Sequence, residues 1–99
     1  MDVTLLYFKD CPNWKQTDAH LNILAAELPD LKVTRQLVES PEEADRVGFR
    51  GSPSVLVDGV DPFADLDARV GLACRVYQTP QGPAGSPTLN QLRELLHPR

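Results

Sequence analysis

The chain contains little cysteine, few aromatic residues and no long hydrophobic run. Only two of its 99 residues are cysteines, Cys11 and Cys74, and 6% are aromatic. Two cysteines are too few for a disulfide-rich scaffold, and without a Cys-x-x-Cys pair the two histidines do not indicate a zinc site. We therefore expect a core built mainly from Leu, Val and Ala, with no metal and no other cofactor.

Charge and hydropathy argue against two further classes of partner. The formal net charge is −4 and the pI about 5.0, and Lys and Arg form no cluster of the kind that binds a nucleic-acid backbone. The first residues show no basic region and no signal-cleavage pattern, and no apolar run is long enough to cross a bilayer. We expect a cytoplasmic protein without nucleic-acid or membrane partners, whose cysteines a reducing compartment keeps as thiols.

The first half of the chain alternates strand and helix patterns. Residues 3–8 form a continuous apolar, β-rich run, typical of a strand covered on both faces. Apolar residues recur at helical spacing over residues 14–28, and Pro29 ends that helix. Residues 31–37 alternate as a half-buried strand does. Residues 40–47 open on Ser-Pro-Glu-Glu, which combines a capping serine, a proline at the first helical position and a capping box, and so predicts a short helix.

The second half predicts two strands, a loop and a final helix. Residues 54–57 read as a strand that Asp58-Gly59 turns over. Residues 74–78 read as the next strand, and the proline- and glycine-rich residues 79–87 as a loop. Thr88 is a capping residue with glutamine at the third helical position, and it precedes a leucine stripe typical of an amphipathic helix.

These elements predict one α/β domain spanning residues 1–99, in the order β-α-β-α-β-β-α. Strands that alternate with helices favour right-handed crossovers and a mixed sheet with helices on both faces. We therefore expect a four-stranded mixed sheet flanked by helices. Residues 60–73 show no clear pattern.

Two segments of the chain resemble thioredoxins. Residues 11–15, Cys-Pro-Asn-Trp-Lys, stand between the first strand and the first helix, where thioredoxins carry Cys-x-x-Cys-Lys. Residues 48–57, Gly-Phe-Arg-Gly-Ser-Pro-Ser-Val-Leu-Val, are similar to the stretch that leads into the cis-proline strand of that family. The resemblance covers roughly residues 2–60 and implies a thioredoxin-like fold. It also implies that Pro53 follows a cis peptide bond and faces the cysteine loop.

Cys11 is the candidate reactive group. It precedes a helix, whose unpaired N–H groups and positive dipole end stabilise a thiolate and lower the pKa of the thiol. Asp10 opposes this effect by like-charge repulsion and Lys15 supports it, and we expect the net shift to be downward. The position at a strand-to-helix junction predicts an exposed side chain.

Trp14 occupies the position of the family's resolving cysteine, so a dithiol cycle is not available within the motif. We therefore predict a thiol-dependent redox protein in which Cys11 forms a mixed disulfide with a small thiol or with the thiol of a partner protein. Ser52 and Pro53 would form the platform for that ligand. Arg50 would attract an anionic ligand or pair with a carboxylate, and Trp14 would shield the mixed disulfide or pack in the core.

One alternative pairs Cys11 with Cys74. Residues 71–77 and 86–88 are similar to a stretch around a cysteine in organomercurial (alkylmercury) lyases. This resemblance implies cleavage of a carbon–mercury bond by two cysteines, whose soft thiolates suit mercury. The family also uses an aspartate, and Trp14 stands in the corresponding place. The residues that would have to replace it are Asp10, Asp61 or Asp65.

The other alternative is a thioredoxin-fold binding module without catalytic activity, with a homodimer as one form of it. In that interpretation Cys11 is a small buried hydrophobe. Residues 58–67 contain four aspartates without the spacing of a calcium loop, so we expect a solvated acidic loop. Residues 61–64 are expected to fold back over the cysteine loop as a flap anchored by Phe63.

Overall fold

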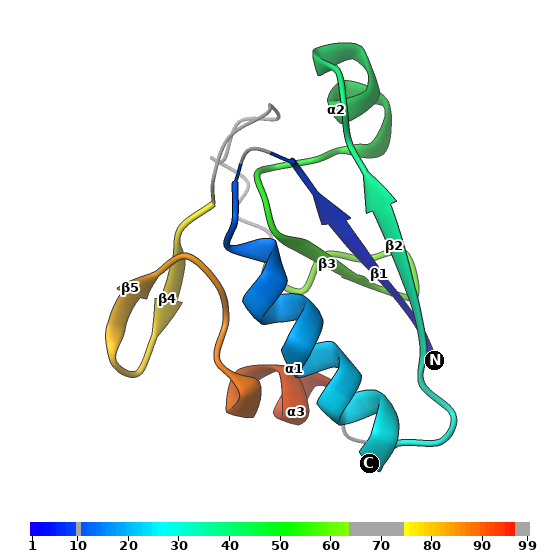
Figure 1. Cartoon of the computed structure of the whole chain (residues 1–99), viewed down its shortest axis with the longest axis vertical. Helices are drawn as coiled ribbons and strands as arrows, with labels where there is room; N and C mark the ends of the chain where they lie inside the picture. Colours follow the sequence, from blue (N-terminus) through cyan, green and yellow to red (C-terminus); the bar gives the residue numbers. More distant parts are fainter. Residues whose placement is uncertain (10, 64–74, 97–99) are drawn as a thin grey trace.

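The computed structural model describes residues 1–9, 11–63 and 75–96 of the chain (Figure 1). The elements are β1 (Asp2–Tyr7), α1 (Trp14–Glu27), β2 (Lys32–Leu37), α2 (Pro41–Val47), β3 (Ser54–Val57), β4 (Tyr77–Thr79), β5 (Gly82–Ala84) and α3 (Leu89–Leu96). Within the described ranges, no helix combines the length and the apolar character that crossing a membrane requires.

A three-stranded mixed sheet carries the architecture. Its order is β2-β1-β3, with β1 parallel to β2 and antiparallel to β3. Val3 lies opposite Val33 on one side and opposite Val57 on the other. The central position of β1 agrees with its continuous apolar sequence, because a strand with neighbours on both sides and layers on both faces buries side chains of both orientations. Val3, Leu5 and Leu6 are all buried.

The prediction of a four-stranded sheet is wrong for the part of the chain that the structure describes. β4 pairs instead with β5, which lies in the segment expected to be a loop, and Tyr77 stands opposite Ala84. The turn between them explains the pairing. The Thr79 hydroxyl accepts a hydrogen bond from the Gln81 amide and donates one to the Gly82 carbonyl. Gly82 adopts a φ of 103°, which favours glycine. The hairpin therefore supplies β4 with its backbone partners locally.

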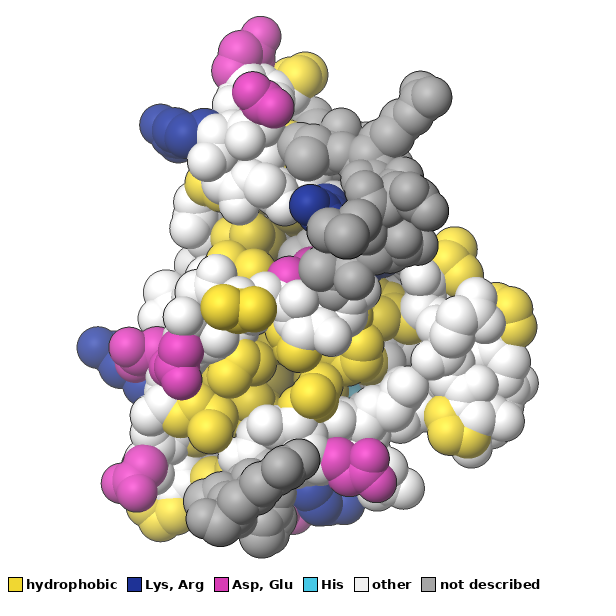
Figure 2. All heavy atoms as spheres, turned by 180° about the vertical axis from the view of Figure 1, so that it is seen from behind, with side chains coloured by type: hydrophobic (Ala, Val, Ile, Leu, Met, Phe, Trp, Pro, Cys, Tyr) yellow, Lys and Arg dark blue, Asp and Glu magenta, His cyan; other side chains and the backbone are white. Residues whose placement is uncertain are grey.

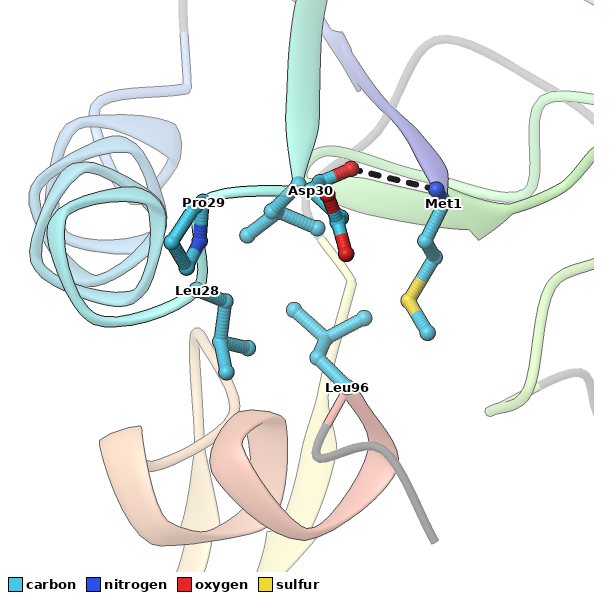
Figure 3. A pocket seen from close by; sticks show the side chains of 6 residues that line it. Met1, Leu28, Pro29, Asp30 and Leu96 are labelled. Carbon is cyan, nitrogen blue, oxygen red and sulfur yellow. Dashed lines mark hydrogen bonds between the residues drawn. The ribbon is translucent and has the colours of Figure 1, made fainter.

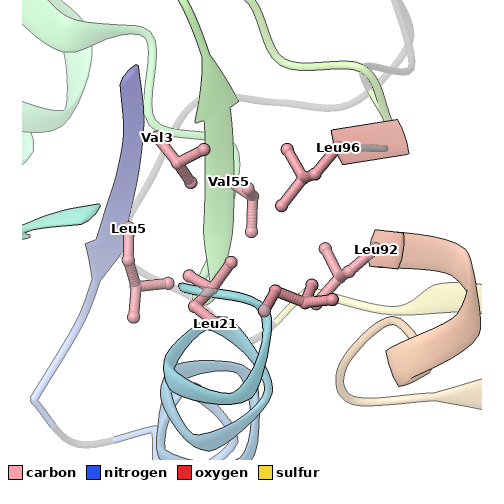
Figure 4. Close-up of a cluster of buried hydrophobic side chains, with 7 residues drawn as sticks. Val3, Leu5, Leu21, Val55, Leu92 and Leu96 are labelled. Carbon is pink, nitrogen blue, oxygen red and sulfur yellow. The ribbon is translucent and has the colours of Figure 1, made fainter. Parts of the chain in front are cut away.

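The two faces of the sheet carry separate hydrophobic clusters. The first cluster lies between the sheet and helices α1 and α3 (Figure 4), and consists of Val3, Leu5, Leu21, Leu24, Val55, Leu92 and Leu96. The second cluster includes Leu6, which follows Leu5 in β1 and therefore points to the opposite face, and Phe49 at the end of α2. Viewed from behind, hydrophobic side chains gather in the middle of the molecule, with acidic side chains towards its margins (Figure 2).

Both predicted helix starts are confirmed. In α2 the Ser40 hydroxyl accepts a hydrogen bond from the Glu43 amide at 3.1 Å, and Pro41 is the first helical residue. At α3 the Gln91 amide donates to the Thr88 hydroxyl at 3.0 Å, and the Thr88 amide donates to the Gln91 side chain at 2.9 Å. These bonds satisfy amide groups that have no partner within their helix.

Removal of the α2 cap gives a first testable expectation. Ser40→Ala should lower the free energy of unfolding by about 1 kcal/mol, because the Glu43 amide loses its acceptor. Urea unfolding followed by circular dichroism measures the change. Ser40→Asp keeps an acceptor at the same position and is the matched control, so an equal loss in both variants would contradict the assigned role.

Candidate functional site

The loop that leads into β3 has the predicted geometry. The Ser52–Pro53 peptide bond is cis, as the resemblance implied. We call Gly51–Ser54 the cis-proline loop, and all of its residues are buried. Gly51 adopts a φ of 116°, a conformation that side chains with a Cβ rarely reach. The Ser54 hydroxyl donates to the Gly51 carbonyl at 2.6 Å, which closes the loop on itself.

The cis-proline loop lies against the cysteine. The sulfur of Cys11 is 3.6 Å from the carbonyl oxygen of Ser52, so the expected approach of the two loops is confirmed. The expected exposure of Cys11 is wrong, because the side chain has 0% of its surface exposed. The contact with the cis-proline loop contributes to this burial, because it covers the sulfur with the Ser52 carbonyl.

Cys11 is oxidised in the structure. Its sulfur is disulfide-bonded, and none of the cysteines that the structure describes is a free thiol. The chain's other cysteine, Cys74, lies outside the described residues, as does Asp10. The expectation of a lowered thiol pKa therefore concerns the reduced protein. In the oxidised state the Cys11 sulfur carries no proton, and its position against the Ser52 carbonyl is a packing contact.

The start of α1 follows the cysteine closely. Asn13 precedes the first helical residue, and the Cys11 amide donates to the Phe8 carbonyl at 3.1 Å. Trp14 is half-buried and stacks on Tyr7, with ring centroids 4.4 Å apart. It also packs against the first cluster. Of the two interpretations of Trp14, these contacts support core packing.

The remaining predicted ligand-binding residues lie at or beside the cis-proline loop. Arg50 is half-buried and directly precedes this loop. The Ser52 hydroxyl is buried and finds no hydrogen-bond partner within the described ranges. Ser52 and Pro53 are both buried. A ligand on the surface would therefore not contact their side chains in this conformation.

Sequence reasoning missed Arg75, which connects the loop to the rest of the site. Its backbone amide donates to the Ser52 carbonyl at 3.0 Å, the same oxygen that touches Cys11. Its guanidinium pairs with Asp61 at 2.6 Å, with only 8% and 13% of the two side chains exposed. The same guanidinium donates to the Phe63 carbonyl at 2.5 Å and to the Ser54 hydroxyl at 3.4 Å.

Tyr77 was also missed as a site residue. Its hydroxyl donates to the Pro53 carbonyl, and burial raises its pKa above the usual value, so the group stays a donor. The Arg75 guanidinium lies 4.7 Å from the centre of the Tyr77 ring, and the Phe63 ring packs edge-on at 5.1 Å. A signal was present, because residues 75 and 77 fall on one face of the strand predicted over residues 74–78, and a buried arginine on that face needs a partner.

The expected solvated acidic loop is wrong for Asp61, which is largely buried and paired with Arg75. Asp58 is exposed, as expected, and its carboxylate accepts a hydrogen bond from the Asp2 amide at 2.8 Å. Asp65 lies outside the described residues, as does Ala64 of the expected flap. The described contacts of Phe63 are with the first cluster and Tyr77, and not with the cysteine loop that it was expected to cover.

A cavity lies at the end of β1 opposite to Cys11. It has a volume of about 110 Å³ and is bordered by the start of β1 and by the C-terminal ends of α1 and α3 (Figure 3). Its lining residues are Met1, Leu28, Pro29, Asp30, Leu31 and Leu96. The Met1 ammonium donates to the Asp30 carbonyl at 3.2 Å. β1 runs from this cavity towards the cysteine loop, so the cavity is separate from the sulfur.

Comparisons with protein-family models, with curated proteins and with solved structures found no match to this chain.

Proposed function

We propose that the protein is a thiol–disulfide redox protein with a thioredoxin-like fold, in which Cys11 and Cys74 form the redox couple. The observation that carries this proposal is the disulfide-bonded Cys11 beside the cis Ser52–Pro53 bond. A redox-active sulfur placed against a cis-proline loop, directly before a helix, is the arrangement that the resemblance to thioredoxins implies.

The order and pairing of the first elements support the proposed fold. β1 and β2 are parallel and joined through α1, and β3 returns antiparallel on the other edge of β1. Helix α1 covers one face, and α2 belongs to the cluster on the other. The cysteine at the end of β1 and the cis-proline at the start of β3 therefore meet at one end of the sheet.

The choice of Cys74 as partner follows from the contacts of Arg75. Cys74 is the only other cysteine of the chain, and the residue after it donates its amide to the Ser52 carbonyl that touches the Cys11 sulfur. Consecutive Cα atoms are about 3.8 Å apart, so the covalent chain limits how far Cys74 lies from this carbonyl. A disulfide requires Cα atoms roughly 4.4–6.8 Å apart, and the proposed pairing of Cys11 with Cys74 is compatible with this requirement. Cys74 would thus be the second cysteine of the redox couple, in place of the one that Trp14 replaces in the motif.

The proposed reaction is a balanced exchange of two electrons. An external thiolate attacks the Cys74 sulfur, because Cys11 has no exposed surface. A mixed disulfide forms at Cys74, the bond between the two cysteines breaks, and its electron pair goes to Cys11, which leaves as a thiolate and takes up a proton from water. A second external thiolate then attacks the external sulfur of the mixed disulfide, and Cys74 leaves as a thiolate and takes up a proton from water. The protein ends with two thiols, and two external thiols are oxidised to one disulfide.

Thiol counting tests this function. The protein as purified under air should show no thiol that reacts with a maleimide under denaturing conditions, and two such thiols after reduction. Cys11→Ser and Cys74→Ser should each show one thiol without reduction, because the remaining cysteine has lost its partner. Titration of the wild-type protein against glutathione buffers should give one reversible two-electron transition.

Other outcomes separate the alternatives. Two thiols in the unreduced protein, or disulfides formed only between chains, would exclude the proposed couple. Release of the hydrocarbon from an organomercurial by the reduced protein would instead favour a lyase-like activity. A couple that no thiol reagent reduces without unfolding the protein would favour a binding module in which the disulfide is structural.

A further inference from the structure

One short segment, Arg75–Tyr77, makes several hydrogen bonds to the cis-proline loop. The Arg75 amide binds the Ser52 carbonyl, and the Tyr77 hydroxyl binds the Pro53 carbonyl. The Arg75 guanidinium also reaches the Ser54 hydroxyl at 3.4 Å. The carbonyls of Ser52 and Pro53 are therefore held by two residues that lie two positions apart in the sequence. The Ser52 carbonyl oxygen in turn lies 3.6 Å from the Cys11 sulfur.

The positive charge of Arg75 is balanced inside the protein by the carboxylate of Asp61. The Arg75 side chain is 8% exposed and that of Asp61 13% exposed, so both ions have lost most of their water. The Arg75 guanidinium has three further partners, namely the Phe63 carbonyl, the Ser54 hydroxyl and the Tyr77 ring. A buried ion pair of this kind is neutral as a whole, but either ion alone would act strongly on neighbouring groups, because little water screens it.

We propose that the buried Asp61–Arg75 pair is a positioning and charge-balancing device that holds the Ser52–Pro53 loop against Cys11 and sets how readily its thiol ionises. This proposal rests on the proposed function in one respect, since it gives Cys11 a role as a redox sulfur. It adds two residues, Asp61 and Arg75, that act on the sulfur through the cis-proline loop and without touching the reacting atoms.

The other charged groups near Cys11 are placed differently from this pair. Lys9 and Lys15 flank the cysteine on its own segment, and both side chains are exposed. Solvent therefore screens their effect on the sulfur. Arg50 is half-buried before the cis-proline loop, and it is left unchanged in every variant below. Asp10 is outside the described residues and is likewise unchanged.

The sign of the effect differs between the two partners of the pair. Asp61→Asn removes the negative charge and leaves the buried Arg75 cation, which favours a thiolate, so the pKa of the Cys11 thiol should fall. Arg75→Met removes the cation and leaves the Asp61 carboxylate, so the thiol pKa should rise. For a buried unit charge within reach of the site, each shift should be roughly one pH unit. The double variant restores neutrality and should lie between the two.

The experiment measures the ultraviolet absorbance of the Cys11 thiolate against pH in a Cys74→Ser background. Cys11 is then the only thiol, and the measurement does not depend on the proposed disulfide partner. Four proteins are compared: the background itself, Asp61→Asn, Arg75→Met and the double variant. Glu27→Gln is the matched control, because it breaks the Arg93–Glu27 pair, whose side chains are 36% and 46% exposed and which involves no residue of the cis-proline loop.

Opposite shifts in the two single variants, with the double variant between them and the control unchanged, are the expected result. If the pair had only a structural role, the direction of the pKa shift would not depend on which of the two charges is removed. Shifts in the same direction, or none, would overturn the proposal even if glutathione titration of the wild type shows a reversible couple. Where Arg75→Met does not fold, Arg75→Lys keeps the charge and should retain the background pKa, while Asp61→Asn must still lower it.

Discussion

Reduction of the Cys11 disulfide is expected to lower the free energy of unfolding by roughly 4 kcal/mol, if its loss acts through chain entropy. With Cys74 as the partner, the closed loop spans 74 − 11 = 63 residues. Opening a loop of this length gives the unfolded chain many more conformations, and the folded state gains nothing comparable because Cys11 remains packed in the buried cis-proline contact. Few single changes in a chain of 99 residues should have a larger effect.

Urea unfolding of the oxidised and the reduced protein measures this difference. The Cys74→Ser variant is the control, because its stability should be the same with and without reductant. A wild-type protein whose unfolding midpoint does not move on reduction would contradict the expectation. The slope of the transition should also rise on reduction, since an uncrosslinked chain exposes more surface when it unfolds.

Truncation of Leu92 in α3 should have the second large effect. Leu92→Ala is expected to lower the free energy of unfolding by about 2–5 kcal/mol, because it opens a cavity in the first cluster where α3 meets α1 and the sheet (Figure 4). Leu92 is completely buried, and α3 is a short helix whose position depends on this apolar face.

The same helix provides the control for this experiment. Leu95 is 40% exposed, so Leu95→Ala removes a side chain of equal size that is only partly packed. Urea unfolding should show a much smaller loss for Leu95→Ala, within roughly 1 kcal/mol of the wild type. Equal losses in the two variants would show that helix propensity or net hydrophobicity, and not burial of Leu92, controls the contribution of α3.

The first half of the fold was predictable because its signals are local. The apolar run of β1, the capping box at Ser40 and the turn at Asp58-Gly59 each determine their element from a few adjacent residues. The approach of the cis-proline loop to Cys11 was predictable for another reason. It was inferred from the resemblance to thioredoxins, whose fold places the two loops together, and no local sequence pattern would have shown it.

Two of the errors concern contacts between segments distant in the sequence, and the third concerns a local turn. The burial of Cys11 depends on a loop that begins 40 residues later in the chain, since the sulfur meets Ser52 with a separation of 41 residues. The Asp61 carboxylate is paired with the Arg75 guanidinium and not solvated, and the composition of the loop does not reveal this pairing. The β4–β5 hairpin formed where prolines predicted a loop, because Thr79 and Gly82 complete a tight turn.

The complete burial of Cys11 also governs how fast a reagent can modify this sulfur in the reduced protein. A reagent in solution reaches this sulfur only in those molecules whose cis-proline loop has moved away, as water reaches a protected amide during hydrogen exchange. The observed rate is then the product of an opening equilibrium constant and the rate of the exposed thiolate. A slow alkylation of Cys11 would therefore measure the local stability of the loop, even where the sulfur itself is a strong nucleophile.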